Sequence, residues 1–154
     1  MSRQVGYNEP ELIGMIAPEL IAEILGLGPA VRTVAELESA VSAGLPRRSL
    51  ELLSARLHSD RKIANAYKFK VVPQATWKRR TKRLSLDESE RTERLARVLA
   101  HAEYAWDDRE QARDWMNKPH RELQDRSPLE VARTELGARR VEDLLDKLFY
   151  GLPV

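Results

Sequence analysis

The 154-residue sequence contains no cysteine, and this absence excludes a disulfide framework, an iron–sulfur cluster and a thiolate zinc site. No apolar run approaches the roughly 20 residues that a membrane-spanning helix needs, so we expect no membrane partner. The first residues, Met1-Ser2-Arg3-Gln4, lack the apolar core of a signal peptide. The sequence therefore predicts a cytoplasmic protein.

Strand patterns are also scarce, whereas helix signals occur along most of the chain. No segment alternates polar and apolar residues for long enough to require a sheet, and the β-branched pair Val71-Val72 is followed by a proline. Three residue pairs have the spacing of a capping box, in which reciprocal hydrogen bonds start a helix: Thr33 with Glu36, Ser85 with Glu88, and Ser127 with Glu130. We therefore predict an all-α protein of about seven to nine helices, with a long helix over residues 86–106.

Apolar residues at helical spacing predict further helices on both sides of this long helix. They cover residues 18–26 or 18–28, 34–43, the region of 50–57, 107–119 and the segment from 138 to 150. In the first of them Leu20, Ile21, Ile24 and Leu25 form an apolar stripe, which serves either as core or as a dimer interface. Val34 is placed on the apolar face of the second, and Trp77, Trp106 and Trp115 are expected in the core.

The net charge of +2 conceals a strong asymmetry between the two halves of the chain. Residues 1–83 carry 14 Lys/Arg and 8 Asp/Glu, whereas residues 84–154 carry 12 and 16. Two surfaces of opposite charge indicate two different partners. We therefore predict a helical DNA-binding and dimerisation domain over residues 1–84 and a second helical domain over residues 85–154.

Residues 61–83 hold nine basic residues and no acidic one, and they have the pattern of a helix-turn-helix over about residues 59–83. Ser59 or Asp60 caps a first short helix, residues 69–71 form the turn, and a second helix extends from about residue 73 to 83. Gln74, Thr76 and Lys78 are predicted to face base edges. The remaining predicted DNA contacts, to phosphates, are Arg79, Arg80, Lys82 and Arg83.

A simpler alternative to a DNA-binding motif is an amphipathic helix whose basic face is only exposed to solvent. Such a helix normally carries acidic residues four positions from the basic ones, as ion-pair partners. If the segment does bind DNA, a homodimer is expected, because one recognition helix covers only a half-site.

No sequence motif indicates catalysis. The nucleophile-elbow, dinucleotide-binding and P-loop patterns are missing, and His58, His101 and His120 lack metal-ligand spacing, so they are expected at surface or half-buried positions. We predict no catalytic residue, no metal and no cofactor, and hence a binding protein rather than an enzyme.

A succession of short motifs runs along the C-terminal half: residues 89–91 (Ser-Glu-Arg), 115–119 (Trp-Met-Asn-Lys-Pro), 127–130 (Ser-Pro-Leu-Glu), 133–141 and the pair Tyr150-Gly151. In this order the motifs resemble the toxin-binding domain of Xre/MbcA/ParS-type antitoxins. Residues 72–80 look like the Xre-like recognition helix of the same family, so the similarity covers roughly residues 45–154. One departure concerns the loop before Ser127, where the family usually has a glycine pair and this chain has Leu123-Gln124-Asp125-Arg126.

The resemblance implies an antitoxin of a two-gene toxin–antitoxin module. The implied partners are a RES-domain toxin, which degrades NAD or uses it for ADP-ribosylation, and operator DNA, bound by an oligomer that represses its own operon. The resemblance also implies that the antitoxin occludes the active site of the toxin. The contact residues would be Arg133, Arg140 and the tail of Tyr150, Gly151, Leu152, Pro153 and Val154. The alternative is a stand-alone helix-turn-helix transcriptional regulator whose C-terminal half dimerises or senses a ligand.

Overall fold

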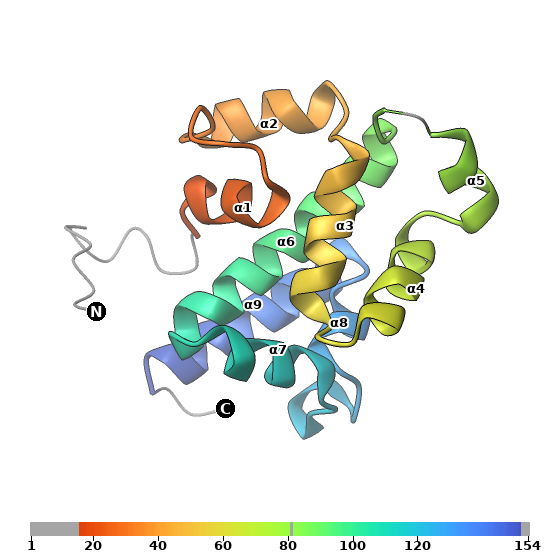
Figure 1. The fold of residues 1–154 in the computed structure, drawn as a ribbon. Coiled ribbons are helices and arrows are strands. Elements are labelled where there is room, and N and C mark those ends of the chain that lie inside the picture. Colours follow the sequence, from red (N-terminus) through yellow and green to blue (C-terminus); the bar gives the residue numbers. More distant parts are fainter. Residues whose placement is uncertain (1–15, 81, 152–154) are drawn as a thin grey trace.

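The computed structural model describes residues 16–80 and 82–151, and within these ranges the chain is entirely helical (Figure 1). The elements are α1 (Pro18–Leu25), α2 (Val34–Ser42), α3 (Arg47–Leu57), α4 (Arg61–Val71), α5 (Gln74–Arg79), α6 (Leu86–Trp106), α7 (Arg109–Asn117), the 3₁₀ turn η2 (Arg121–Leu123), α8 (Pro128–Val131) and α9 (Glu135–Phe149). The predicted all-α fold is confirmed for these residues. None of the described helices is long and apolar enough to cross a membrane.

The long helix α6 lies at the centre of the fold, and α1, α2, α3, α4, α7 and α9 all contact it (Figure 1). It begins at the predicted capping box, because the Ser85 hydroxyl accepts from the Glu88 N–H at 3.2 Å and the Glu88 carboxylate accepts from the Ser85 N–H at 2.7 Å. Its 21 residues span about 30 Å at 1.5 Å per residue. The prediction of a helix over residues 86–106 is confirmed.

One hydrophobic core extends from α1 to α9 and crosses the change of charge at residue 84. Leu25, Leu53, Leu99 and Leu145 are each at most 1% exposed and belong to the same cluster. The division into domains at residue 84 stays a prediction. The apolar stripe of α1 is core in this structure: Ile21, Ile24 and Leu25 are buried and Leu20 packs against them.

The predicted turn at residues 69–71 is wrong, and the second helix of the pair is shorter than expected. α4 continues to Val71, and the turn is formed by extended Val72 and by Pro73, because a proline disfavours helical backbone in the residue before it. α5 ends at Arg79 rather than residue 83. The following segment pairs instead with the start of α3, where the Leu84 N–H donates to the Leu45 carbonyl at 2.8 Å.

Three further expectations are corrected by the packing. Trp106, the last residue of α6, is 38% exposed because it lies at the end of the helix, and Val34 is 59% exposed in the first turn of α2. The last helix starts at Glu135, before Gly137, since the Thr134 hydroxyl accepts from the Gly137 N–H at 3.0 Å and caps it.

Gly137 sits where α8 and α9 approach most closely. A Cβ atom at this position would lie 1.8 Å from the carbonyl oxygen of Val131, which is backbone and cannot rotate away. Glycine is therefore required here for space, although its helical backbone conformation would suit any residue.

We expect Gly137→Ala to lower the free energy of unfolding by at least about 1–3 kcal/mol, because α9 must move away from α8 to admit the methyl group. Urea denaturation followed by circular dichroism measures the effect. Arg139→Ala, two residues further along the exposed side of α9, is the matched control and should change stability by about 0.5 kcal/mol or less. Equal midpoints for Gly137→Ala and the wild type would contradict this account of the α8–α9 contact.

Candidate nucleic-acid and partner interfaces

Helices α4 and α5 form the pair that the sequence predicted as a helix-turn-helix. Asp60, one of the two predicted caps, begins α4 by accepting from the Lys62 and Ile63 N–H groups at 2.9 and 3.0 Å. The inner face of α4 consists of Ala64, Tyr67 and Val71, at helical spacing. Burial raises the pKa of the Tyr67 hydroxyl well above its usual range, and the nearby positive charge of Arg133 offsets only part of this rise.

Helix α5 has only six residues, so its position depends on tertiary contacts rather than on intrinsic helix stability. Its buried Trp77 lies between two cations: the Arg47 guanidinium carbon is 4.1 Å from the ring centroid and the Lys68 ammonium nitrogen is 4.8 Å away. Cation–π contacts of this kind contribute about 0.5–2 kcal/mol each. They anchor α5 to α3 and α4.

A buried ion pair ties α5 to the start of α6. The Arg80 Nε donates to a Glu88 carboxylate oxygen at 2.8 Å, and the Glu88 side chain is only 5% exposed. Burial acts to raise the pKa of Glu88, but hydrogen bonds from the Ser85 N–H and from Arg80 outweigh it and hold the pKa below its ordinary value. Arg91 adds a second link, since its Nη1 donates to the Val71 carbonyl at 2.8 Å and caps the end of α4.

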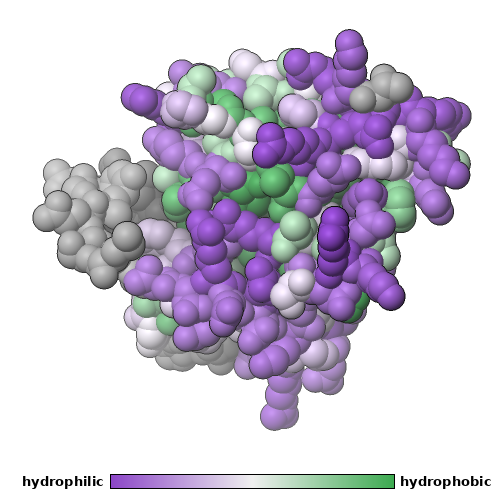
Figure 2. Space-filling view, in the orientation of Figure 1, coloured by the Kyte–Doolittle hydropathy of each residue, from purple (hydrophilic) through white to green (hydrophobic). Residues whose placement is uncertain are grey.

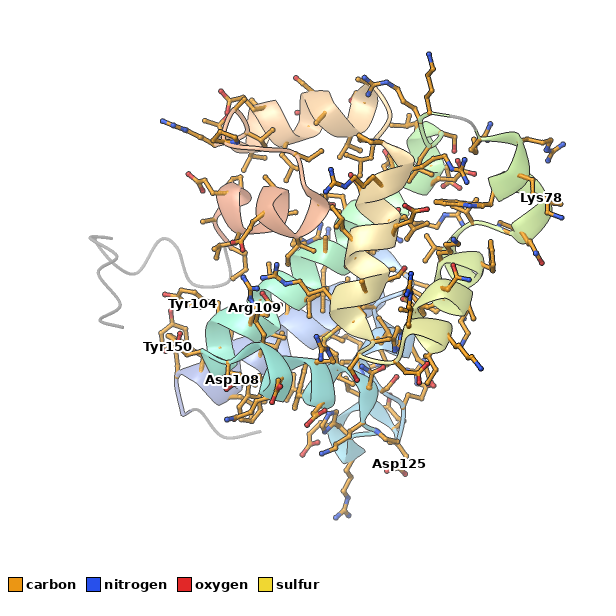
Figure 3. The ribbon with its side chains drawn as sticks, in the orientation of Figure 1. Lys78, Tyr104, Asp108, Arg109, Asp125 and Tyr150 are labelled. Carbon is orange, nitrogen blue, oxygen red and sulfur yellow. The ribbon has the colours of Figure 1, made fainter. Side chains whose placement is uncertain are left out.

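The predicted DNA-contacting residues have three different environments. Gln74, Lys78 and Arg79 are exposed on α5, Lys82 and Arg83 are exposed in the segment after it, Thr76 is half-buried, and Arg80 is held by Glu88. Lys78 projects outward from α5 at the edge of the molecule (Figure 3). Hydrophilic residues cover the visible surface over α5 and the adjoining chain (Figure 2).

The predicted toxin-binding residues lie along α9 rather than at one point. Arg133 is exposed in the turn before α9, Arg140 is exposed near its middle, and Tyr150 and Gly151 follow its last residue. Ten residues of helix separate Arg140 from Tyr150 by about 15 Å. Leu152, Pro153 and Val154 lie outside the described residues.

An open pocket of about 330 Å³ lies between η2 and α9 and is lined in part by Arg140. The Arg140 guanidinium donates to the Gln124 side-chain oxygen at 2.7 Å, which fixes the arginine at the edge of this pocket. Gln124 and Asp125 both have left-handed backbone, with φ values of 54° and 57°. This loop therefore keeps a conformation that favours glycine, although the family's glycine pair is replaced here.

Polar contacts that the sequence analysis missed hold α9 against α6. Arg97 pairs with Glu142 at 2.6 Å and with Glu93 and Glu135 at 3.3 Å. Burial raises the pKa of Glu93, and the charge of Arg97 opposes that rise. His101 was expected at a surface or half-buried position but is buried, with Nε2 2.8 Å from Asp146. The contacts between α6 and α9 had no sequence signal, because each joins residues some 40 positions apart in the chain, whereas Arg97 and Glu93 are four residues apart within α6.

Residues 101–151, which include α7, α8 and α9, match a family model described as the antitoxin Xre/MbcA/ParS C-terminal toxin-binding domain. This part of the chain is similar to the toxin-binding domain of Xre/MbcA/ParS antitoxins. The resemblance inferred from the sequence motifs is confirmed to that extent. The Xre/MbcA/ParS domain is thus formed by the end of α6 and the helices packed around it.

A curated relative extends the similarity beyond this domain. "Antitoxin Xre" of Pseudomonas putida is 31% identical over 84 residues, which are 53% of this chain and 53% of that protein. The chain therefore spans about half the length of the curated relative that it matches.

The Arg80–Glu88 pair generates a prediction about stability and pH. Because the folded-state pKa of Glu88 is lowered, its carboxylate stabilises the fold above its unfolded pKa of about 4.3, and this contribution is lost as the pH falls through the folded pKa. We expect Glu88→Gln to destabilise the protein by about 1–2 kcal/mol at pH 7 and to make its stability less dependent on pH below about 5.

Urea denaturation at pH 7 and pH 4 measures both effects. Glu90→Gln, an exposed carboxylate two residues further along α6, is the matched control. If Glu88→Gln and Glu90→Gln have the same stability at both pH values, the buried ion pair does not hold α5 in place.

Proposed function

We propose that this protein is the antitoxin of a toxin–antitoxin module, which neutralises its toxin through the C-terminal domain and binds operator DNA through α4 and α5. The observation that carries the proposal is the match of residues 101–151 to an antitoxin toxin-binding domain. The similarity to "Antitoxin Xre" over 84 residues supports the same class.

The proposed toxin is a RES-domain enzyme that uses NAD as its substrate, and the antitoxin occludes its active site. This assignment follows from the sequence resemblance described above. It is supported by charge, because residues 84–154 carry 16 acidic and 12 basic residues, an excess that complements a basic cleft of the kind that can hold a pyrophosphate. The protein itself supplies no catalytic group in this proposal.

Operator binding is supported by the composition and the exposure of α5. Gln74, Lys78 and Arg79 are exposed on α5. The sequence contains no acidic residue from position 61 to position 83, the segment that includes this helix. An amide and two cations provide groups for both base edges and phosphates. We also propose a homodimer, because one short recognition helix covers only half of an operator site.

The α5 surface and the tail end of the toxin surface lie at opposite ends of α6, whereas Arg133, whose carbonyl accepts from Arg94 at 3.1 Å, lies beside the first half of α6. Glu88 in its first turn holds α5, whereas the ring of Tyr104 near its other end lies 5.3 Å from that of Phe149, next to Tyr150. Figure 3 shows Lys78 and Tyr150 on opposite sides of the molecule. This arrangement allows a toxin at the end of α9 and DNA at α5 to bind at the same time.

The proposal is tested against a stand-alone regulator by co-expressing the protein with the product of the neighbouring gene. An antitoxin is expected to co-purify with that product and to restore growth of cells in which it is toxic. A regulator that only dimerises or senses a ligand would bind DNA but would neither capture the neighbouring protein nor protect the cells.

For the DNA surface, we expect Arg79→Glu to weaken binding to operator and random duplexes alike and to reduce the slope of log K against log salt by about 1 for each bound protomer, because each protomer loses a phosphate contact. Gln74→Ala should instead reduce only the preference for the operator, by about 1–3 kcal/mol. Fluorescence anisotropy at several salt concentrations measures both quantities. Unchanged binding of both variants would remove α5 from the DNA interface.

For the toxin surface, we expect Tyr150→Ala to cost about 2 kcal/mol or more of toxin affinity, since a half-exposed tyrosine offers a large contact area at low entropic cost. Deleting residues 152–154 should likewise reduce growth rescue if the tail occludes the NAD pocket. Val34→Ala, an exposed apolar residue on α2, is the control for surface truncation. If the shortened protein keeps its melting temperature and protects cells fully, neutralisation comes from the helix faces and not from the tail.

A further inference from the structure

Two basic segments that are far apart in the chain meet beside α5. The backbone of residues 82–84 pairs with that of residues 45–47, through a hydrogen bond from the Arg47 N–H to the Lys82 carbonyl at 3.2 Å and an antiparallel bridge between Pro46 and Arg83. The pairing places Arg47 and Arg48, at the start of α3, next to Lys82 and Arg83. Only the second pair belongs to the predicted helix-turn-helix, because α3 lies outside it.

The positive charges of these four residues, which we call the α3 basic cluster, are not neutralised within the described part of the chain. No ion pair joins any of them to a described carboxylate. Glu51, on the same helix as Arg47 and Arg48, is 4.0 Å from Lys68, and Glu88 pairs with Arg80. Like charges held together repel one another, and this repulsion is relieved when an anion binds.

Two members of the cluster are held in place by contacts that leave their charge uncompensated. The Arg47 guanidinium stacks 4.1 Å from the centre of the Trp77 ring, and Arg83 donates to the Gly44 carbonyl at 2.7 Å. Both contacts restrict the side chains before any ligand arrives, so less entropy is lost on binding. Arg48 and Lys82 are exposed beside them.

The cluster lies beside α5. Because Arg47 stacks on Trp77, it lies next to the helix that carries Lys78 and Arg79. When such a helix enters the major groove, flanking cations reach the phosphates on either side. Arginine suits this contact because its guanidinium matches the geometry of a phosphate.

We propose that the α3 basic cluster binds the phosphate backbone of duplex DNA and extends the DNA interface beyond the helix-turn-helix. The inference rests on the proposed operator-binding function, and it adds Arg47 and Arg48 to the interface. The cluster contributes affinity without reading sequence, since it contacts phosphates and not base edges.

The test is the salt dependence of DNA binding by the full-length chain. The probes are a fluorescent duplex of the region upstream of its own gene and a random duplex of equal length, each titrated between 50 and 200 mM salt. Each lost phosphate contact lowers the slope of log K against log salt by about 0.9. For each bound protomer we expect a slope change of about 1 for Arg48→Gln and about 2 for the double variant Arg48→Gln/Lys82→Gln, with an unchanged ratio of upstream to random affinity.

Matched variants separate this effect from general loss of charge or of folding. Arg139→Gln removes one exposed positive charge from α9, away from the cluster, and should leave the slope unchanged. Arg48→Lys keeps the charge and should restore most of the slope. Melting temperatures of all variants are compared with that of the wild type, since Arg48 has an exposed side chain and is not required by the core.

The outcomes distinguish the inference from the function on which it rests. If the wild type binds neither duplex in a salt-dependent way, operator binding itself is wrong and the inference fails with it. If the wild type binds and Arg79→Glu weakens binding, while Arg48→Gln matches Arg139→Gln, then the function stands and the α3 basic cluster is not part of the interface. Loss of toxin capture by Arg48→Gln with intact DNA binding would assign the cluster to the protein partner instead, and would also overturn the inference.

Discussion

Burial of α6 on nearly all of its sides is the constraint on which the other helices depend. Ala96, Val98, Leu99 and Ala102 are fully buried, and they point to different sides of the helix because successive residues are about 100° apart. Alanine at two of these positions lets neighbouring helices approach closely. A helix of this kind cannot be stable in water alone, so the helices that contact it, α1, α2, α3, α4, α7 and α9, are needed to cover it. The same helix therefore holds both proposed interfaces in a fixed relation.

The arginines divide into two groups with different physical roles. Arg56 donates two hydrogen bonds of 2.7 Å to Glu103, Arg80 pairs with the buried Glu88, and Arg97 pairs with Glu142. Desolvated pairs of this kind hold helices together, since breaking one leaves an unpaired buried charge. Arg48 and Arg79, by contrast, are exposed and have no described carboxylate partner. Cations of the second kind add little to stability and are available to an anionic partner.

Two backbone positions show how packing decides which residue a site tolerates. Gly137 is required because a Cβ would collide with the Val131 carbonyl, a reason that lies in the approach of α8 to α9. Gln124 and Asp125 adopt left-handed backbone without being glycine, at a cost of about 1–2 kcal/mol per residue. A hydrogen bond from Arg140 to Gln124 helps to offset that cost and explains how a glycine-free loop keeps this shape. Neither explanation is visible in the local sequence.

The sequence by itself determined the helical class, the start of α6 at Ser85, the basic segment around α5 and the similarity of the C-terminal part to an antitoxin domain. Each of these depends on residues close together in the chain: apolar periodicity, caps, charge runs and ordered motifs. It did not determine where α5 ends, because the pairing of residues 82–84 with 45–47 stops that helix. It also did not reveal that Arg80 is held by Glu88 or that Arg47 stacks on Trp77. Only the tertiary structure decided these points, because packing brings together groups that are distant in sequence and so determines which charges pair and which stay exposed.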